Sequence, residues 1–136
     1  MTRLPYDAAG ARDGASAMSA THLPVRVSVA HSSEADVVTV SGSLDVATAS
    51  ALRDVVFDPS ACTRPTLVLY LDDLEFLDAR GIATLVATRR RVAAREGTLV
   101  IACARPHLRR LLRITRLDTV VPVVASVDEA LGRPQT

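Results

Sequence analysis

The sequence TLVLYLDDLEFLDARG occupies residues 66–81 and joins an apolar run to an acidic segment. The run at residues 66–71 is almost continuously apolar, which is typical of a central strand buried on both faces of a sheet. The acidic segment at residues 72–81 is expected to be a loop, and a helix is predicted from about Arg80 to Arg95. Binding sites in open α/β sheets lie at the carboxyl ends of the strands, so we expect the functional site at this loop.

Two short strands are expected before this stretch, at residues 25–31 and 36–41. The first alternates apolar and polar side chains, which is typical of a half-buried strand. Gly42 is expected to end the second, and the short polar turn between the two predicts a hairpin. The next segment has helical spacing of its apolar residues, and either Asp45 or Thr48 is the expected cap, because both can accept from the unpaired N–H groups of a first turn.

The chain after the long helix is expected to add two strands and two helices. Residues 98–103, TLVIAC, predict another buried strand. Pro106 opens an amphipathic helix. Residues 119–124 are expected to form a short last strand, and Pro122 predicts that it lies at a sheet edge or bulge, because proline lacks the N–H that a ladder needs. Ser126 is the expected cap of a final helical turn.

The helix predicted at residues 80–95 carries a polar stripe with helical spacing, opposite a set of apolar residues. The polar stripe consists of Thr84, Thr88, Arg91 and Arg95. The opposite side of the helix consists of Ile82, Val86 and Ala93. We therefore expect the threonines to face away from the core.

The alternation of strands and helices predicts an α/β fold with a single domain. It favours a mixed, largely parallel sheet of about five strands, with about four helices packed chiefly on one face because parallel crossovers are right-handed. The domain is expected at residues 23–132. Residues 1–22 are rich in Ala, Gly and Ser without hydrophobic periodicity, which predicts a flexible N-terminal tail. Residues 133–136 are expected to form a C-terminal tail.

Composition excludes several classes of function. The 136 residues carry a net charge of +1, include no lysine and are only 3% aromatic. Without lysine there is no Schiff-base chemistry and no Walker-A phosphate site. Cys62 and Cys103 have no CxxC spacing and are expected to be buried thiols in a reducing cytosol. No apolar run reaches the ~18 residues of a membrane span, and no signal peptide is recognisable. We expect a cytoplasmic protein that is not an enzyme and uses no cofactor or metal.

Two charge patterns suggest other functions that the sequence does not favour. The acidic loop resembles the phosphorylation site of a receiver domain, but that chemistry needs an acidic pair after the first strand and a lysine, and both are missing. Residues 89–116 hold nine arginines and one glutamate, which would suit nucleic acid. No recognition motif accompanies these arginines, so solvated helix faces are the favoured interpretation, with no nucleic-acid partner.

Three motifs occur in a fixed order along the chain. The first is GSLD at residues 42–45, and the second is FLDARG at residues 76–81. The third is RRLLRITRLD at residues 109–118, continued by SVDEAL at residues 126–131. Across residues 25–131 the chain resembles STAS domains of the anti-sigma-factor-antagonist kind. The resemblance implies a partner-switching module that binds an anti-sigma factor, usually a serine kinase-like protein, and so frees a sigma factor.

In that family the kinase ends the binding by phosphorylating a serine in a D-S-[ST]-G segment. Here Ala79 and Arg80 occupy the two hydroxyl positions, and Arg80 stands where the phosphate would go. A cation at a helix N-terminus costs about 0.3–1 kcal/mol unless it is paired, with Asp45, Asp73 or Asp78 as possible partners. Two further departures are Ser43, where an acid is common, and Tyr70, where an aspartate usually ends the strand. The usual serine switch is therefore not expected.

The resemblance implies a partner-binding surface and no catalytic or metal-binding residue. This surface is expected to include Ser43, Asp45, Thr48, Asp78, Ala79, Arg80, Gly81 and Thr84. The main alternative is an accessory subunit of a lipid-transport ATPase or of a stressosome-like assembly. Binding of a small ligand or nucleotide is a further alternative, although no Gly-rich phosphate loop supports it.

Overall fold

A mixed β-sheet forms the centre of the structure, a computed structural model that describes residues 3–4 and 24–132. The strands within these residues lie in the order β1-β2-β3-β4-β6-β7, and β5 pairs with β3. Their bounds are Arg3–Leu4 (β1), Arg26–His31 (β2), Ala35–Leu44 (β3), Thr66–Tyr70 (β4), Leu74–Leu77 (β5), Thr98–Ala102 (β6) and Val123–Val124 (β7). The pairings β1–β2 and β2–β3 are antiparallel, and all the others are parallel. The predicted mixed, largely parallel α/β sheet is confirmed.

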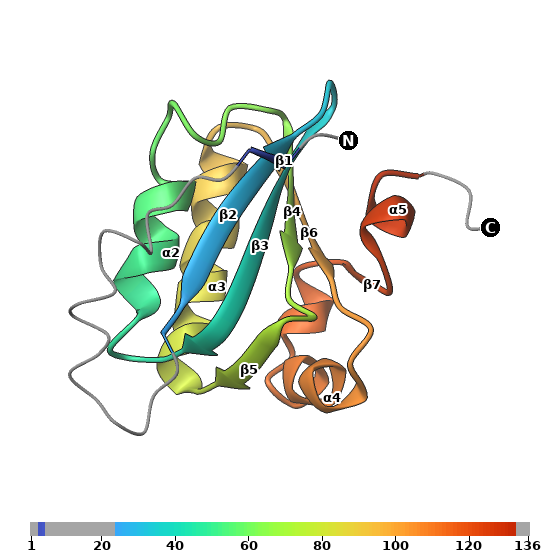
Figure 1. Cartoon of the computed structure of the whole chain (residues 1–136). Helices are drawn as coiled ribbons and strands as arrows, with labels where there is room; N and C mark the ends of the chain where they lie inside the picture. The colour runs from blue at the N-terminus through green and yellow to red at the C-terminus, as the bar shows by residue number, and fades with distance from the viewer. Residues whose placement is uncertain (1–2, 5–23, 133–136) are drawn as a thin grey trace.

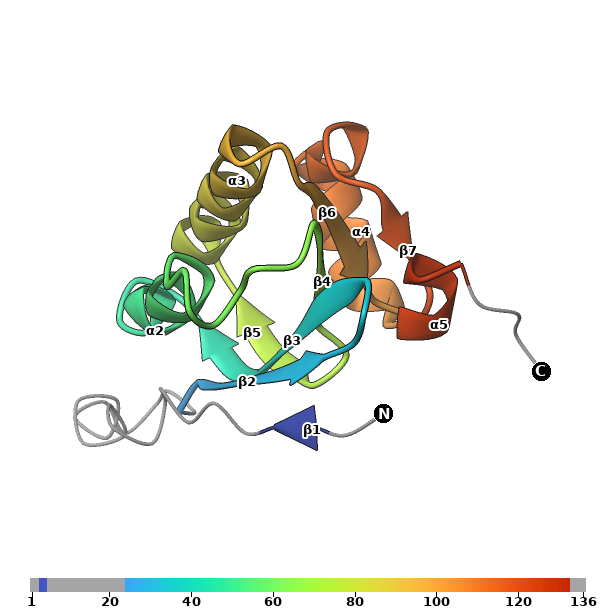
Figure 2. The same cartoon turned by 90° about the horizontal axis from the view of Figure 1, so that it is seen from above.

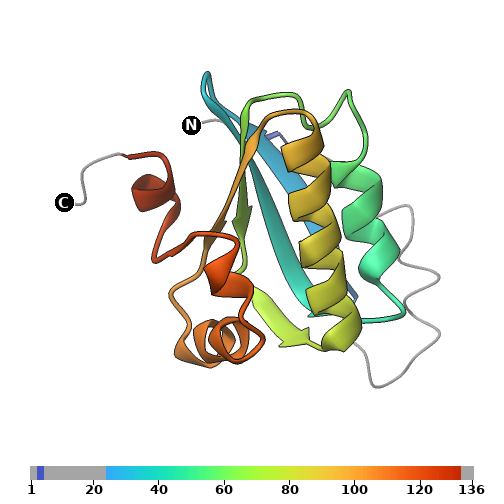
Figure 3. The same cartoon turned by 180° about the vertical axis from the view of Figure 1, so that it is seen from behind.

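Helices cover the sheet mainly on one face (Figures 2 and 3). Their bounds are Ala49–Val56 (α2), Ala79–Ala94 (α3), Pro106–Ile114 (α4) and Val127–Ala130 (α5), with a 3-10 turn at Leu117–Thr119 (η2). Side chains of α2, α3 and α4 share one large core with the sheet, whereas α5 packs on the opposite face over a smaller apolar cluster. The predicted placement of helices chiefly on one face is confirmed.

The central position of β4 explains its apolar sequence. Leu67 and Leu69 point into the large core, while Val68 points into the small cluster beneath α5. All three side chains are fully buried, so the strand has no solvent-facing side. β6 lies beside β4 in register, and the short β7 forms the edge expected from Pro122. Ser126 caps α5 as predicted, accepting from the Glu129 N–H at 3.1 Å.

Four predicted boundaries or faces are wrong. The last strand, expected at residues 119–124, is limited to Val123–Val124, and Thr119 ends the 3-10 turn η2 instead. Gly42 does not end β3, which continues to Leu44 through a bulge between Gly42 and Ser43. The segment expected to be an acidic loop contains a strand, β5, whose Leu74 is fully buried in the large core. On α3, Thr84 and Thr88 face inward with the core instead of outward. Each threonine hydroxyl donates to the carbonyl four residues earlier, so its burial leaves no unsatisfied donor.

The expected tails lie almost entirely outside the described residues. The exception is Arg3–Leu4, which pairs antiparallel with Val29 and Ala30 at the outer edge of β2. Within the described residues, no helix combines the length and apolar character that crossing a membrane requires.

Candidate functional site

The candidate site lies where β3 and β5 end and α3 begins, at the lower end of the sheet in Figure 1. Leu44, the last residue of β3, is in register with Leu77, the last residue of β5. The Asp78 N–H then donates to the Leu44 carbonyl at 3.4 Å, and α3 starts at Ala79. The parallel pairing of two strand ends therefore fixes where the first turn of α3 stands, as expected from the carboxyl-end rule.

A hydrogen-bonded turn connects β3 to α2 on one side of this site. The Thr48 hydroxyl donates to the Ser43 carbonyl at 2.5 Å and accepts from the Asp45 N–H at 3.0 Å. The Asp45 carboxylate accepts from the N–H groups of Ala47 and Thr48 at 3.0 and 3.2 Å. Thr48 occupies the N-cap position of α2 but makes no side-chain cap bond to the helix. Of the two predicted caps, Thr48 therefore has the cap position, whereas the Asp45 carboxylate accepts from the N–H groups of the turn that leads into α2.

Asp78 and Gly81 bring α3 against the end of β3. Asp78 is the N-cap, and its carboxylate accepts from the Gly81 N–H at 3.0 Å. A Cβ on Gly81 would lie 2.4 Å from the Leu44 carbonyl oxygen and 2.5 Å from the Leu77 side chain. Only glycine fits here, because the helix backbone approaches the strand backbone too closely for any side chain.

The outer surface of the site is built from four exposed residues. Ala79 and Arg80 are exposed on the first turn of α3. Val46 follows the end of β3 and is 68% exposed, and Phe76, opposite Ser43 in the β3–β5 register, is 49% exposed. Within residues 24–132, no carboxylate pairs with Arg80, so none of the possible aspartate partners holds it. The site thus carries a cation without an ion-pair partner on the first turn of α3, and exposed apolar side chains at Val46 after β3 and Phe76 in β5.

The structure brings the eight predicted surface residues together but exposes few of them. Buried residues are Ser43, Asp45, Thr48, Gly81 and Thr84, and Asp78 is half-buried. Only Ala79 and Arg80 are exposed. The buried members support the surface from below. Val46 and Phe76 escaped the sequence reasoning, although each is a large apolar residue beside a quoted motif or within one.

The structure offers little material for metal chemistry in its described part. No group of three or more His, Cys, Asp or Glu residues within residues 24–132 is arranged to hold a metal ion. Two of the four acidic residues of segment 72–81 serve other contacts: Asp78 caps α3, and the Asp72 carboxylate accepts from the Ala104 N–H at 2.7 Å.

Both cysteines are free thiols inside the structure, and we predict that they are unreactive in the folded protein. Burial, assisted by the nearby Asp36 carboxylate, raises the pKa of the Cys62 thiol to about 12. Burial also raises the pKa of Cys103. Because the thiolate is the reacting form, a disulfide reagent at pH 8 should modify either thiol of the folded protein only as fast as the protein unfolds. In concentrated urea, where the protein is unfolded, both thiols should react quickly. Rapid modification of either thiol without denaturant would contradict this expectation.

Comparisons with known protein families and solved structures agree with the fold described above. The sequence model of the STAS domain family matches residues 26–130. The chain is similar to the crystal structure of an anti-sigma factor antagonist from Mycobacterium paratuberculosis, with 31% sequence identity and a TM-score of 0.71 over 79% of this chain and 92% of that one.

Two structures of SpoIIAA have the same fold at lower identity. The unphosphorylated anti-sigma factor antagonist SpoIIAA is 17% identical, with a TM-score of 0.63 over 80% of this chain and 99% of that one. The Bacillus cell fate determinant SpoIIAA in its phosphorylated form is 19% identical, with a TM-score of 0.59 over 78% and 96%. The family match spans both strand ends and the first turn of α3 that make up the site, and the chain belongs to the STAS domain family.

Proposed function

We propose that this protein binds an anti-sigma factor of the kinase-like kind through the first turn of α3, and that it regulates sigma-factor-dependent transcription in the cytoplasm by binding and not by catalysis. The observation that carries the proposal is the exposed group of Arg80, Ala79, Val46 and Phe76. An arginine together with exposed aromatic and aliphatic side chains is the composition of an interface centre. The similarity to the Mycobacterium paratuberculosis antagonist supports the same partner class.

The supporting structure beneath this surface suits a rigid docking site. Asp45 and Thr48 are buried at the two ends of their turn and hydrogen-bonded within it, and the Asp78 cap fixes the first turn of α3. Side chains on such a support lose little backbone freedom when a partner docks, which lowers the entropic cost of binding. We therefore propose that Ser43, Asp45, Thr48 and Thr84 position the surface without touching the partner.

We further propose that binding is constitutive, without a serine phosphorylation switch. Arg80 has no hydroxyl to accept a phosphoryl group. The nearest alternatives are buried: the Ser43 side chain is 4% exposed, and the Thr84 hydroxyl donates to the Arg80 carbonyl inside the helix. A kinase active site needs an accessible hydroxyl, so neither residue replaces the missing serine.

Reversing the charge at position 80 is expected to weaken partner binding at least tenfold. Arg80→Glu places an anion where the partner meets a cation, and like-charge contacts across an interface are costly. An acid in the first turn favours the helix dipole, so the variant should be at least as stable as the parent and loss of binding cannot reflect unfolding. The measurement is capture from native cell extract, followed by titration of the captured protein against parent, Arg80→Glu and Arg80→Ser.

Arg90→Glu is the matched control, because Arg90 is an exposed arginine of the same helix away from its first turn. It should bind like the parent. Equal capture by parent, Arg80→Glu and Arg90→Glu would exclude the first turn of α3 as the docking site. Capture of a transport ATPase or a large scaffold in place of a kinase-like protein would assign the accessory-subunit role instead.

A further inference from the structure

A surface hollow lies at the far end of α3 from the candidate site. Its volume is about 390 Å3, within the range of small-molecule sites. The wall combines the last turns of α2 and α3 with the loop that leads to β4, and its lining residues include Val56, Phe57, Pro59, Thr63, Arg91 and Arg95. From Arg80 to this hollow is roughly 20 Å along the helix at ~1.5 Å per residue, so the two sites are separate.

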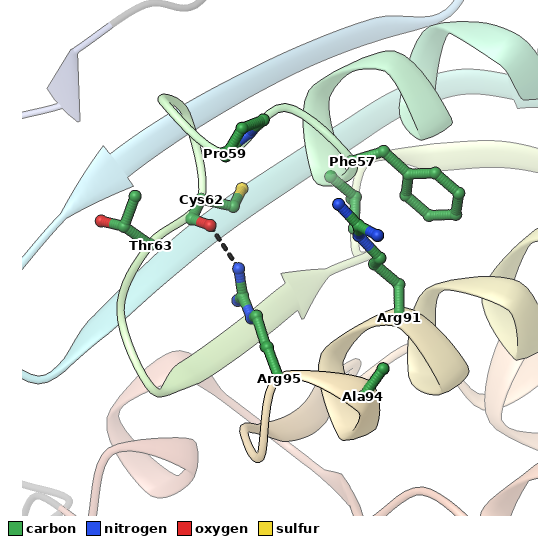
Figure 4. A pocket seen from close by; sticks show the side chains of 8 residues that line it. Phe57, Pro59, Cys62, Thr63, Arg91, Ala94 and Arg95 are labelled. Atoms are coloured by element: carbon green, nitrogen blue, oxygen red, sulfur yellow. Dashed lines mark hydrogen bonds between the residues drawn. The ribbon is translucent and has the colours of Figure 1, made fainter.

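Two arginines of α3 project towards this hollow (Figure 4). Arg91 and Arg95 are four residues apart, which places them on the same face of the helix about one turn apart. The Arg91 guanidinium stands 5.4 Å from the centroid of the Phe57 ring. Arg95 donates to the backbone carbonyls of Cys62 and Arg64. These contacts orient both groups without neutralising either.

The two arginines of the hollow have no ion-pair partner in the described part of the chain. Asp58 lies in sequence between two lining residues, and its carboxylate accepts from the N–H and hydroxyl of Ser60. None of the lining residues is an acid, and no carboxylate within residues 24–132 pairs with Arg91 or Arg95. Two like charges one helical turn apart repel each other. An anion between them would relieve that repulsion, and guanidinium groups match the oxygen geometry of phosphate.

We propose that this hollow binds a small organic phosphate monoester. Its phosphate, with a charge near −2 at neutral pH, lies between Arg91 and Arg95. Its organic part packs on Val56, Phe57 and Pro59. A monoanion leaves one guanidinium uncompensated, and inorganic phosphate leaves the apolar wall unused.

The test is a titration of the isotope-labelled full chain with phenyl phosphate, followed by amide NMR shifts. Saturable shifts are expected at Phe57, Thr63, Arg91 and Arg95, with affinity at least tenfold lower in Arg91→Gln. Arg91→Lys keeps the charge but loses the planar guanidinium group, so its affinity for phenyl phosphate should fall between those of the parent and Arg91→Gln. Arg90→Gln removes the same charge from a neighbouring position outside the lining and should bind like the parent. A retained spectrum of the unliganded variants shows that they are folded.

Three results would overturn the proposal. The first is an absence of saturable shifts, or equal affinity in Arg91→Gln and the parent. The second is binding of benzoate as tightly as phenyl phosphate, which would remove the preference for a dianion. The third is inorganic phosphate binding as tightly as phenyl phosphate, which would show that the apolar wall takes no part.

Discussion

Replacing Gly42 by alanine is expected to lower the free energy of unfolding by roughly 2–5 kcal/mol. Two independent effects add at this position. Gly42 has φ +86°, a left-handed conformation that strains a residue with a side chain. A Cβ there would also lie 1.9 Å from the carbonyl oxygen of Pro24, so the segment before β2 must move away. Urea denaturation of the parent and the variant measures the loss.

Gly132→Ala is the matched control for this prediction. Gly132 also has a positive φ, +72°, but a Cβ added there meets nothing within 4 Å. It therefore carries the backbone strain alone and should cost only about 1 kcal/mol. If both variants lose the same stability, the contact with Pro24 is unimportant and the bulge tolerates a side chain. The comparison thus separates backbone strain from steric exclusion at the bulge that precedes the Asp45–Thr48 turn.

The layout of the sheet could be predicted because each buried strand carries its own signal. The apolar runs at residues 66–71 and 98–103 have no polar face, and only the centre of a sheet hides both sides of a strand. Pro122 likewise indicates an edge because its missing N–H is a local property of the residue. Such signals belong to the chain itself and do not depend on which neighbour the strand finds.

β5 could not be predicted because its pairing depends on a distant part of the chain. Its four residues lie among acids, and their strand conformation comes from a parallel pairing with the last three residues of β3. The bulge after Gly42 adjusts the register of that pairing. Interpreting Gly42 as the end of a strand therefore concealed both the extension of β3 and the partner of β5.

The inner face of α3 was misassigned for a different reason. Thr84 and Thr88 look polar in sequence, but a helical threonine can donate its hydroxyl to the carbonyl one turn earlier. Its methyl group then packs as an apolar side chain would. The periodicity of α3 alone cannot distinguish this stripe, shared with Leu85 and Val92, from the half-buried stripe of Ile82 and Val86.

The place of the candidate site could be predicted, but its exposed composition could not. The GSLD and FLDARG motifs locate the two strand ends and the start of α3, and the structure joins them. Whether a motif residue points outward depends on the bulge and on the turn at residues 45–48, which bury most of the polar positions. Val46 is exposed within that turn, and Phe76 is exposed within β5, whose end residues Leu74 and Leu77 take the buried positions.

Replacing Asp36 by alanine is expected to cost roughly 2–4 kcal/mol of unfolding free energy. Its carboxylate is fully buried and accepts three hydrogen bonds. The N–H groups of Thr63 and Arg64 both donate at 2.8 Å, and His31 Nδ1 lies 2.6 Å away. These contacts tie the β2–β3 hairpin to the loop that leads into β4. Alanine would leave two partly buried backbone donors without an acceptor. Denaturant unfolding of the parent and the variant measures the cost.

Two further variants of this cluster show which contacts carry the stability. Asp36→Asn keeps a carbonyl oxygen for the Thr63 and Arg64 N–H groups, so it should lose only part of the stability that alanine loses. His31→Ala removes the partly exposed imidazole and keeps both backbone contacts, so it should cost about 1 kcal/mol. A loss in His31→Ala equal to that of Asp36→Ala would instead assign the stability to the carboxylate–imidazole pair. In that case the loop between α2 and β4 would be held mainly by Arg95, whose guanidinium donates to the carbonyls of Cys62 and Arg64.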